Sequence, residues 1–461
     1  MIGVPAPLRR PDFRGMWLAG LISDGGDWML LVALPTLVYQ LTGSTLGTAV
    51  AFLAELAPPI LLGSVAGRLA DRWDRRRLLL WVSSVQALAV LPLLLVEGRS
   101  DLWIVYLVIT VQASLATFFE PARNAVLPAL VPAGELVSAN SLLGVNTNLG
   151  RLVGGPLGGA LLAFGALEVV VVVDALSFVA AALLVARVRV PPVATGAAVP
   201  TAPTVPPAQA DGVATAGAPD PPPAGAAPAA ERDRGPLRAI LGVAATAAVA
   251  QGLFVVLFVP FVIRGLHGGA SEVGLLRGVQ AIGALAAGAV LGVAGARLRP
   301  AALAAAGAAA FGVLSLAVWN APALTVATPL YVGLFIAVGA PGIVMVTGLV
   351  SVLQRAVPQA AMGRAFGAVG VATAAGQAAG ILAAGVLGDR VGLAPLLDFQ
   401  GSLYLLAGAI ALLTVARRRR PGPPRPVWEL VRSRAHGAES RPWKRPASSS
   451  SGSRSSSDCS G

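Results

Sequence analysis

Two acidic residues, Asp24 and Asp27, lie three positions apart in the stretch "SDGGDWMLL", inside an apolar run from about Gly15 to Gln40. An acid at the centre of a membrane costs about 3 kcal/mol on insertion scales, so it is a functional candidate. Residues three apart share a helix face, and neighbouring carboxylates in a medium of low dielectric constant favour binding of a proton by one of them. The pair predicts a proton-binding site in a membrane-spanning helix, with Asp24 the weaker candidate.

Two more ionisable residues are expected at a similar depth. Glu55 lies about ten residues into the second apolar run, counted from its outer end, and Arg151 lies about 13 residues into the fifth. At a helix rise of about 1.5 Å per residue, both positions are near the middle of the membrane. We expect one layer in which the arginine stays charged and exchanges acidic partners as a proton binds. The alternative is a buried ion pair that only holds the helices in register.

Other polar residues in the apolar runs receive more modest interpretations. Asp174, in "VVVDALSF", is interpreted as structural, and Arg277 is expected to extend to the membrane interface. Several amides fit either a polar path or hydrogen bonds between helices: Gln112, Asn146, Asn148, Gln251, Gln280 and Gln377.

The composition is that of a polytopic membrane protein. Of 461 residues, 56% are hydrophobic and only 12% charged, with a mean hydropathy of +0.75, whereas soluble domains average about 25% charged residues. About 20 apolar residues cross a bilayer. Such runs lie near 15–40, 45–67, 78–97, 102–120, 138–164 and 167–187, and again near 238–263, 270–295, 301–320, 324–350, 364–388 and 395–416.

Arginines orient these runs. They gather at the loops on one side of a twelve-span topology, which predicts that this side and both termini face the cytoplasm. The abundance of Arg, Ala, Gly and Pro suggests a bacterial chain, so we expect it in a bacterial cytoplasmic membrane. We also expect a monomer.

The two halves resemble each other. Adding 226 to Gly150, Gly154 and Gly159 gives three more glycines, Gly376, Gly380 and Gly385. This predicts an all-α fold of two pseudo-symmetric six-helix bundles, with the substrate site between them. The acid pair has no counterpart in the second half, so the chemistry is expected mainly in the first. The predicted parts are bundles at 1–189 and 237–417, a disordered linker at 190–236 and a disordered basic, Ser-rich tail at 418–461.

The loop "GRLADRWDRRR" at 67–77 carries a specific pattern. Topology alone explains its arginines but not Asp71. The stretch resembles the loop motif of the major facilitator superfamily, with Asp74 where the family has glycine, and the matching residues are Gly67, Asp71, Arg72, Arg75 and Arg76. The stretches "PDFRGMWLAGLISDGGDW", "FFEPARNAVLPALVP" and "ANSLLGVNTNLGRLVGGPLGG" resemble the branch of enterobactin-type and multidrug exporters.

The resemblance implies the major facilitator fold, export, and a cytoplasmic gate. In that family the loop acid is thought to hold the outward-facing state, and a carboxylate at a helix N-terminus is favoured by the dipole. We expect Asp71, Arg75 or Arg76, and Glu120, which Arg123 follows, to form a relay that breaks when the cytoplasmic side opens.

The fifth run contains "GRLVGGPLGG", which resembles the family's antiporter motif, although Pro156 falls one residue later than in the family. Gly150, Gly154 and Gly158, followed by Gly159, make a smooth helix face for close packing. Tight packing without a mechanistic role is the alternative.

Other classes of protein fit poorly. Among 34 basic residues Lys444 is the only lysine, so the chain has no P-loop lysine for ATP-driven transport. Only two histidines and one cysteine occur, with no metal motif. We expect no enzyme activity, cofactor or nucleic-acid partner. The leading hypothesis is proton-coupled export of amphipathic or hydrophobic small molecules of drug or siderophore type. A lysophospholipid or lipid translocator and a non-transporting receptor or scaffold are the alternatives.

Overall fold

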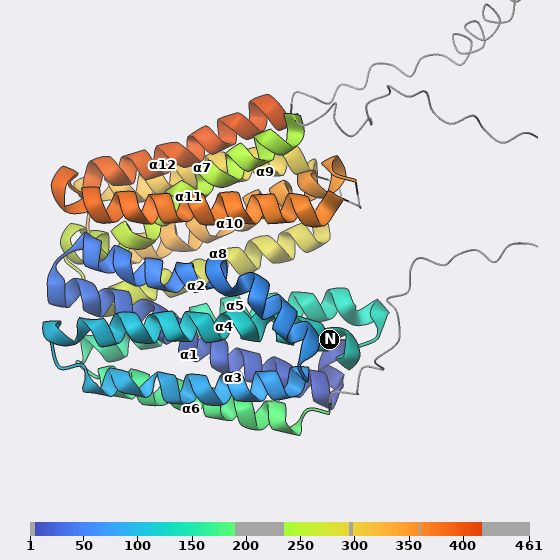
Figure 1. Cartoon of the computed structure of the whole chain (residues 1–461). Helices are drawn as coiled ribbons and strands as arrows, with labels where there is room; N and C mark the ends of the chain where they lie inside the picture. Colours follow the sequence, from blue (N-terminus) through green and yellow to red (C-terminus); the bar gives the residue numbers. More distant parts are fainter. Residues whose placement is uncertain (1–4, 190–234, 295–297, 359–360, 417–461) are drawn as a thin grey trace, which may run out of the picture. The chain divides into compact units, whose positions relative to one another are not determined.

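The structure, a computed structural model, describes residues 5–189, 235–294, 298–358 and 361–416. These residues form twelve α-helices and no strand (Figure 1). The first six are α1 (Pro11–Thr42), α2 (Thr45–Arg72), α3 (Arg75–Ala89), α4 (Leu102–Leu130), α5 (Leu136–Ala163) and α6 (Leu167–Arg187). The others are α7 (Gly235–Pro260), α8 (Ala270–Ala294), α9 (Pro300–Asn320), α10 (Thr328–Ala356), α11 (Met362–Val391) and α12 (Leu393–Ile410).

Eleven candidate spans in the described residues have the length and apolar composition to cross a membrane. The remaining helix, α5, is 28 residues long but carries Asn146, Asn148 and Arg151 among many glycines, which lowers its hydropathy. Large apolar side chains such as Leu61, Val371 and Leu176 are 60–73% exposed, as expected for helices that face lipid. The chain is therefore a multi-pass membrane protein.

The helices pack within two sets (Figure 1). In the first, α1 packs mainly on α5 and α6, and α4 on α2 and α3. In the second, α7 packs on α11 and α12, and α10 on α8 and α9. The two sets meet mainly along α5–α8 and α2–α11.

The glycine repeat marks equivalent contacts. A Cβ at Gly154 would overlap the carbonyl oxygen of Gly25 in α1, and one at Gly380 would overlap that of Val249 in α7. The same equivalence holds between the sets: Gly159 packs on Gly274 of α8, and its counterpart Gly385 packs on Ala49 of α2. The predicted all-α fold of two pseudo-symmetric bundles is confirmed.

Asp74 has a local structural reason to replace the glycine of the loop motif. It is the N-cap of α3, and its Oδ1 accepts a hydrogen bond of 2.7 Å from the backbone N–H of Arg77. An aspartate N-cap satisfies an otherwise unpaired donor of the first helical turn. The bundle limits stay predictions. Residues 190–234 of the predicted linker and the whole predicted tail lie outside the described residues, and α7 already begins at Gly235.

Candidate functional site

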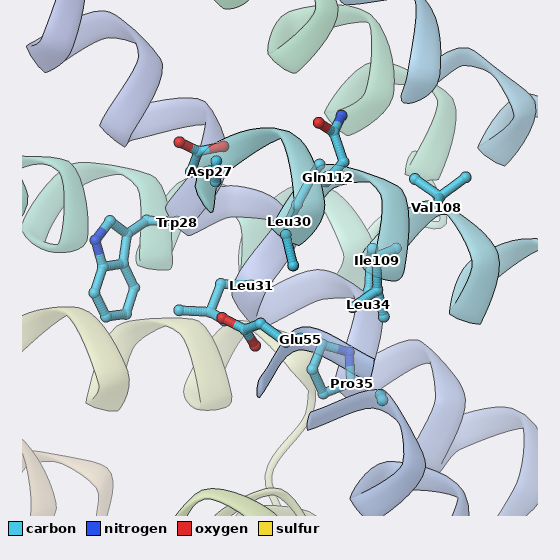
Figure 2. Close-up of a pocket in the computed structure, with 13 residues that line it drawn as sticks. Asp27, Trp28, Leu30, Leu31, Leu34, Pro35, Glu55, Val108, Ile109 and Gln112 are labelled. Atoms are coloured by element: carbon cyan, nitrogen blue, oxygen red, sulfur yellow. The ribbon is translucent and has the colours of Figure 1, made fainter. Parts of the chain in front are cut away.

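Asp27 and Glu55 line the same cavity, of about 240 Å³, between α1, α2 and α4. Figure 2 shows both carboxylates at this pocket together with the amide of Gln112. The rest of the lining is almost entirely apolar: Trp28, Leu30, Leu31, Leu34, Pro35, Ala51, Val108, Ile109, Ala113 and Ala116. Two carboxylates on an apolar wall suit an amphipathic ligand with a polar or charged group.

The side-chain amide of Gln112 makes one hydrogen bond and leaves its oxygen unpaired. Its Nε2 donates a 3.0 Å hydrogen bond to the Gln86 carbonyl on α3, while its buried Oε1 has no hydrogen-bond partner in the described structure. A buried acceptor without a donor is unfavourable. A protonated carboxyl or a ligand N–H in the cavity would satisfy it.

A second cavity, of about 620 Å³, lies between the two helix sets. It shares Leu31, Glu55, Ala113 and Ala116 with the first cavity, so the two adjoin. Its other lining residues are Phe52, Leu56, Pro59, Gly63, Thr117, Glu120, Pro121, Gln251, Val255, Arg277 and Gln377. Because both sets contribute, a change in their contact would reshape this central cavity.

Prolines line these cavities on three helices. Pro35, Pro59 and Pro121 lie inside α1, α2 and α4. Each lacks the N–H that would pair with the carbonyl four residues earlier, at Leu31, Glu55 and Thr117. Backbone of this kind is tolerated in a membrane where it is buried or lines a cavity.

Arg277 lies in the cavity wall rather than at the predicted membrane interface. It was expected at the membrane interface, but its side chain lines the central cavity. Its guanidinium carbon lies 5.0 Å from the ring centroid of Phe254 and 5.9 Å from that of Phe258. Arginine over aromatic faces is a stabilised arrangement. One feature of the sequence could have indicated this position: Arg277 is the only basic residue of α8, whereas arginines at the membrane interface usually occur in groups.

Arg151 lies at the contact between the two sets rather than in the first cavity. Its Nε donates a 3.0 Å hydrogen bond to the backbone carbonyl of Arg277, and its guanidinium carbon lies 5.4 Å from the Trp28 ring centroid. Among the described residues no ion pair joins Arg151 to Asp24, Asp27 or Glu55. The exchange of partners expected from the sequence stays a prediction.

Asp24 faces α5 rather than the cavity shared by Asp27 and Glu55. Its Oδ2 is 3.5 Å from the hydroxyl of Thr147, which donates to it. A Cβ at Gly150 would lie 2.9 Å from the Asp24 backbone. The four predicted residues therefore divide into Asp27 and Glu55 at the cavity, Asp24 at the α1–α5 contact, and Arg151 at the α5–α8 contact.

The glycines of α5 allow contact on two sides. Gly150, Gly154 and Gly158 pack on the α1 backbone, whereas Gly155 and Gly159 pack on α8. The ring of Pro156 packs on Gly278 of α8. Helix α5 thus connects the helix of Asp27 to the helix of Arg277.

The loop between α2 and α3 defines the arginine-rich end of the molecule, with Gly67 on α2 and Arg72, Arg75, Arg76 and Arg77 around the turn. Arg75 Nη1 donates to the Ala125 carbonyl at 2.9 Å, and Arg76 Nη2 donates to the Ala186 carbonyl. Asp71 is in the last turn of α2, and its side chain lies outside the described structure.

Glu120 contacts Arg123 instead of the loop arginines. Arg123 Nη2 lies 2.7 Å from Glu120 Oε2, and the Glu120 side chain is 54% exposed. Glu120 also lines the central cavity on its arginine-rich side. The relay through Asp71 stays a prediction.

The opposite end is joined by a set of polar contacts that we call the far-end cluster: Gly43, Ser44, Thr45, Arg264 and Asp389. Asp389 Oδ2 accepts from the Ser44 hydroxyl at 3.2 Å and from the Thr45 backbone N–H at 3.0 Å. Arg264 Nη2 donates to the Gly43 carbonyl at 2.6 Å, and Arg264 Nη1 lies 3.7 Å from Asp389 Oδ1. These contacts join the two helix sets at the end away from the arginines.

Comparisons with known proteins agree with this architecture. A family model described as transmembrane secretion effector matches residues 2–208. The chain is 33% identical to the MFS-type transporter YfiS of Bacillus subtilis (strain 168), over 35% of this chain and 39% of that protein. It is 27% identical to macrolide efflux protein A of Streptococcus pyogenes, over 39% of this chain and 45% of that protein. The match therefore spans less than half of each relative.

A solved structure extends the likeness in fold to both helix sets. A bacterial homologue of the iron transporter ferroportin, in an inward-facing state, aligns with a TM-score of 0.67 at 18% identity. The alignment covers 89% of this chain and 99% of that protein. Residues 2–208 therefore resemble the transmembrane secretion effectors and MFS-type transporters, and the chain as a whole has the major facilitator fold. These relatives are transporters rather than enzymes, as expected from the sequence.

Proposed function

We propose that this protein of the major facilitator fold is a secondary active transporter that exports amphipathic or hydrophobic small molecules in exchange for protons. The observation that carries the proposal is the shared cavity of Asp27 and Glu55 beside the central cavity lined by both helix sets. Acids inside membrane helices mark proton relays. The efflux activity named for the Streptococcus relative supports the direction of transport.

In this proposal the proton and the substrate use adjoining spaces. The apolar walls bind the hydrophobic body of the substrate, and the carboxylates bind either a proton or its polar group. Alternating access follows from making and breaking the far-end cluster as the two sets move. The arginine-rich end would face the cytoplasm of a bacterial cell.

The test uses the full chain in proteoliposomes with an imposed pH gradient. A macrolide and a lipophilic cation serve as probes, and substrate-stimulated proton flux is the readout. Asp27→Asn is expected to abolish the flux, because an amide neither binds nor releases a proton in this range. Glu97→Gln, at an exposed acid between α3 and α4, is the matched control and should leave the flux unchanged.

Two results would contradict the proposal. Flux that survives Asp27→Asn removes this residue from coupling. Movement of a labelled lysophospholipid, independent of the gradient and without transport of either probe, would favour a lipid translocator.

A further inference from the structure

Asp174 on α6 is a buried carboxyl that the proposed mechanism leaves unused. Its exposed fraction is 0%, and neither side-chain oxygen has a hydrogen-bond partner in the described structure. Ser177, one turn further along α6, is only 7% exposed, and its hydroxyl lies beside the Asp174 carboxyl. An ionised carboxylate in such a place is strongly disfavoured, whereas a protonated carboxylic acid is a neutral dipole.

Asp174 packs directly on the bare backbone beside Asp27. A Cβ at Gly26 of α1 would overlap Asp174 Oδ1 and would lie 2.5 Å from Ser177 Oγ. Gly26 immediately precedes Asp27, and the charges of Asp27 and Asp174 are close enough to interact. The glycine is therefore the position that allows a carboxyl of α6 to approach the α1 acid.

The helices packed on α6 present no free cation to Asp174. On α1, Asp27 is the acid whose charge interacts with that of Asp174, whereas Asp24 faces Thr147 of α5. Helix α3 carries ionisable side chains only in its first turn, at Arg75–Arg77. Helix α5 carries only Arg151, which contacts Trp28 and the Arg277 carbonyl. Without a cation among these described neighbours, the neutral form of Asp174 fits the site.

We propose that Asp174 is a second proton-binding residue, which exchanges its proton with Asp27 past Gly26. In the transfer an O–H bond of Asp174 breaks and an O–H bond of Asp27 forms, so the negative charge moves from Asp27 to Asp174. Before the transfer the proton is held at the α1–α6 contact, and after it the proton is on Asp27 at the substrate cavity. The role in coupling rests on the proposed function, but the protonation of Asp174 does not.

Infrared difference spectroscopy of the purified full chain tests the protonation directly. The C=O stretching band of a protonated carboxylic acid is expected at neutral pH and should be lost in Asp174→Asn. Glu168→Gln, at an exposed acid of the same helix, should keep the band. A band that is absent from the unaltered protein, or that is unchanged in Asp174→Asn, would overturn the proposal.

A glycine pair tests the approach of the carboxyl to α1. Gly26→Ala should shift the band, because the added methyl displaces the Asp174 carboxyl, whereas Gly25→Ala, where a Cβ meets nothing within 4 Å, should not. An identical band in both variants would contradict the contact.

Proton flux in proteoliposomes then tests the exchange. Asp174→Asn should keep binding of the probe substrates and lose the substrate-stimulated proton flux. Flux equal to that of the unaltered protein would overturn the exchange with Asp27. Absence of flux in the unaltered protein would overturn the proposed function instead, and the infrared band would still decide whether Asp174 holds a proton.

Discussion

Single charged residues set what the central cavity can bind. Glu55, Glu120 and Arg277 are its charged lining residues, so the acids outnumber the base. Arg277 is held over two phenylalanine rings at a fixed place in the wall. Because its charge would repel a cation and attract an anion there, we predict that Arg277 contributes to selectivity.

We predict that Arg277→Gln improves binding of lipophilic cations. Loss of one positive charge leaves two acids, and a gain of roughly tenfold in affinity corresponds to about 1.4 kcal/mol. Binding of a cationic and a neutral probe is measured by fluorescence titration, and the neutral probe should change little. Equal changes for the two probes would contradict an electrostatic role. Arg299→Gln, an exposed arginine before α9, is the control.

Arg10 and Glu135 provide a prediction about pH at the arginine-rich end. Arg10 Nε and Nη2 donate to the Glu135 carboxylate at 3.0 and 3.1 Å, which lowers the Glu135 pKa below its usual 4.5. A lowered pKa in the folded state means that the stabilisation is present above the unfolded pKa and is lost as the pH falls through the folded value.

We therefore expect the difference in thermal stability between the unaltered protein and Glu135→Gln to be constant near neutral pH. It should shrink once the pH falls below about 4.5, because the carboxylate then becomes protonated. Unfolding of the detergent-solubilised protein is followed against pH. A difference that does not shrink in acid would show that the ion pair does not stabilise the fold. The effect should be small, since the two side chains are 42% and 25% exposed.

Helix α5 shows how a single element connects the two sets. Its glycines place it against the α1 backbone on one side and against α8 on the other. Small residues of this kind let helices approach closely in lipid, where the hydrophobic effect does not drive them together. A side chain at the contact positions would push the helices apart.

Gly154→Ala should destabilise the protein, because its Cβ would overlap the Gly25 carbonyl oxygen. Overpacking costs about 1–3 kcal/mol, against a gain of up to about 1 kcal/mol in helix propensity. Gly144→Ala in the same helix, where nothing lies within 4 Å of the added Cβ, should be neutral or stabilising. Thermal unfolding in detergent measures both. Equal stability of the two variants would contradict the tight α1–α5 contact.

At the scale of the whole molecule, the far-end cluster joins the two sets while the central cavity reaches towards the arginine-rich end. Asp389 accepts the Thr45 N–H at the start of α2 and lies near Arg264. A carboxylate at a helix N-terminus is favoured by the helix dipole. Removing its charge should weaken the contact between the sets at this end.

We predict that Asp389→Asn increases the separation of the two sets at the far end. Spin labels at Glu97→Cys and Leu324→Cys, in a Cys459→Ser background, report this separation. Double electron–electron resonance measures the distance between the two labels. Asp398→Asn is the matched control, because Asp398 accepts from Asn320 within one set. A distance distribution that is unchanged in Asp389→Asn would contradict the role of the far-end cluster in closing that end.

The sequence by itself determined the apolar spans, the asymmetry of charge between the loops, and the repeat of glycines at a fixed offset. Those features depend on composition and on position along the chain. It also placed Asp27 and Glu55 at a common depth, because depth follows from the rise per residue.

Only the tertiary structure decided which way each side chain faces and what it meets there. Lipid and protein interior are both apolar, so the direction of a membrane helix face leaves little trace in its sequence. Arg277 was therefore expected at the interface yet lines the central cavity, and Arg151 shares a depth with Asp27 yet packs on α8. The sequence leaves Asp174 without a named neighbour, whereas the packing places it on Gly26, which immediately precedes Asp27.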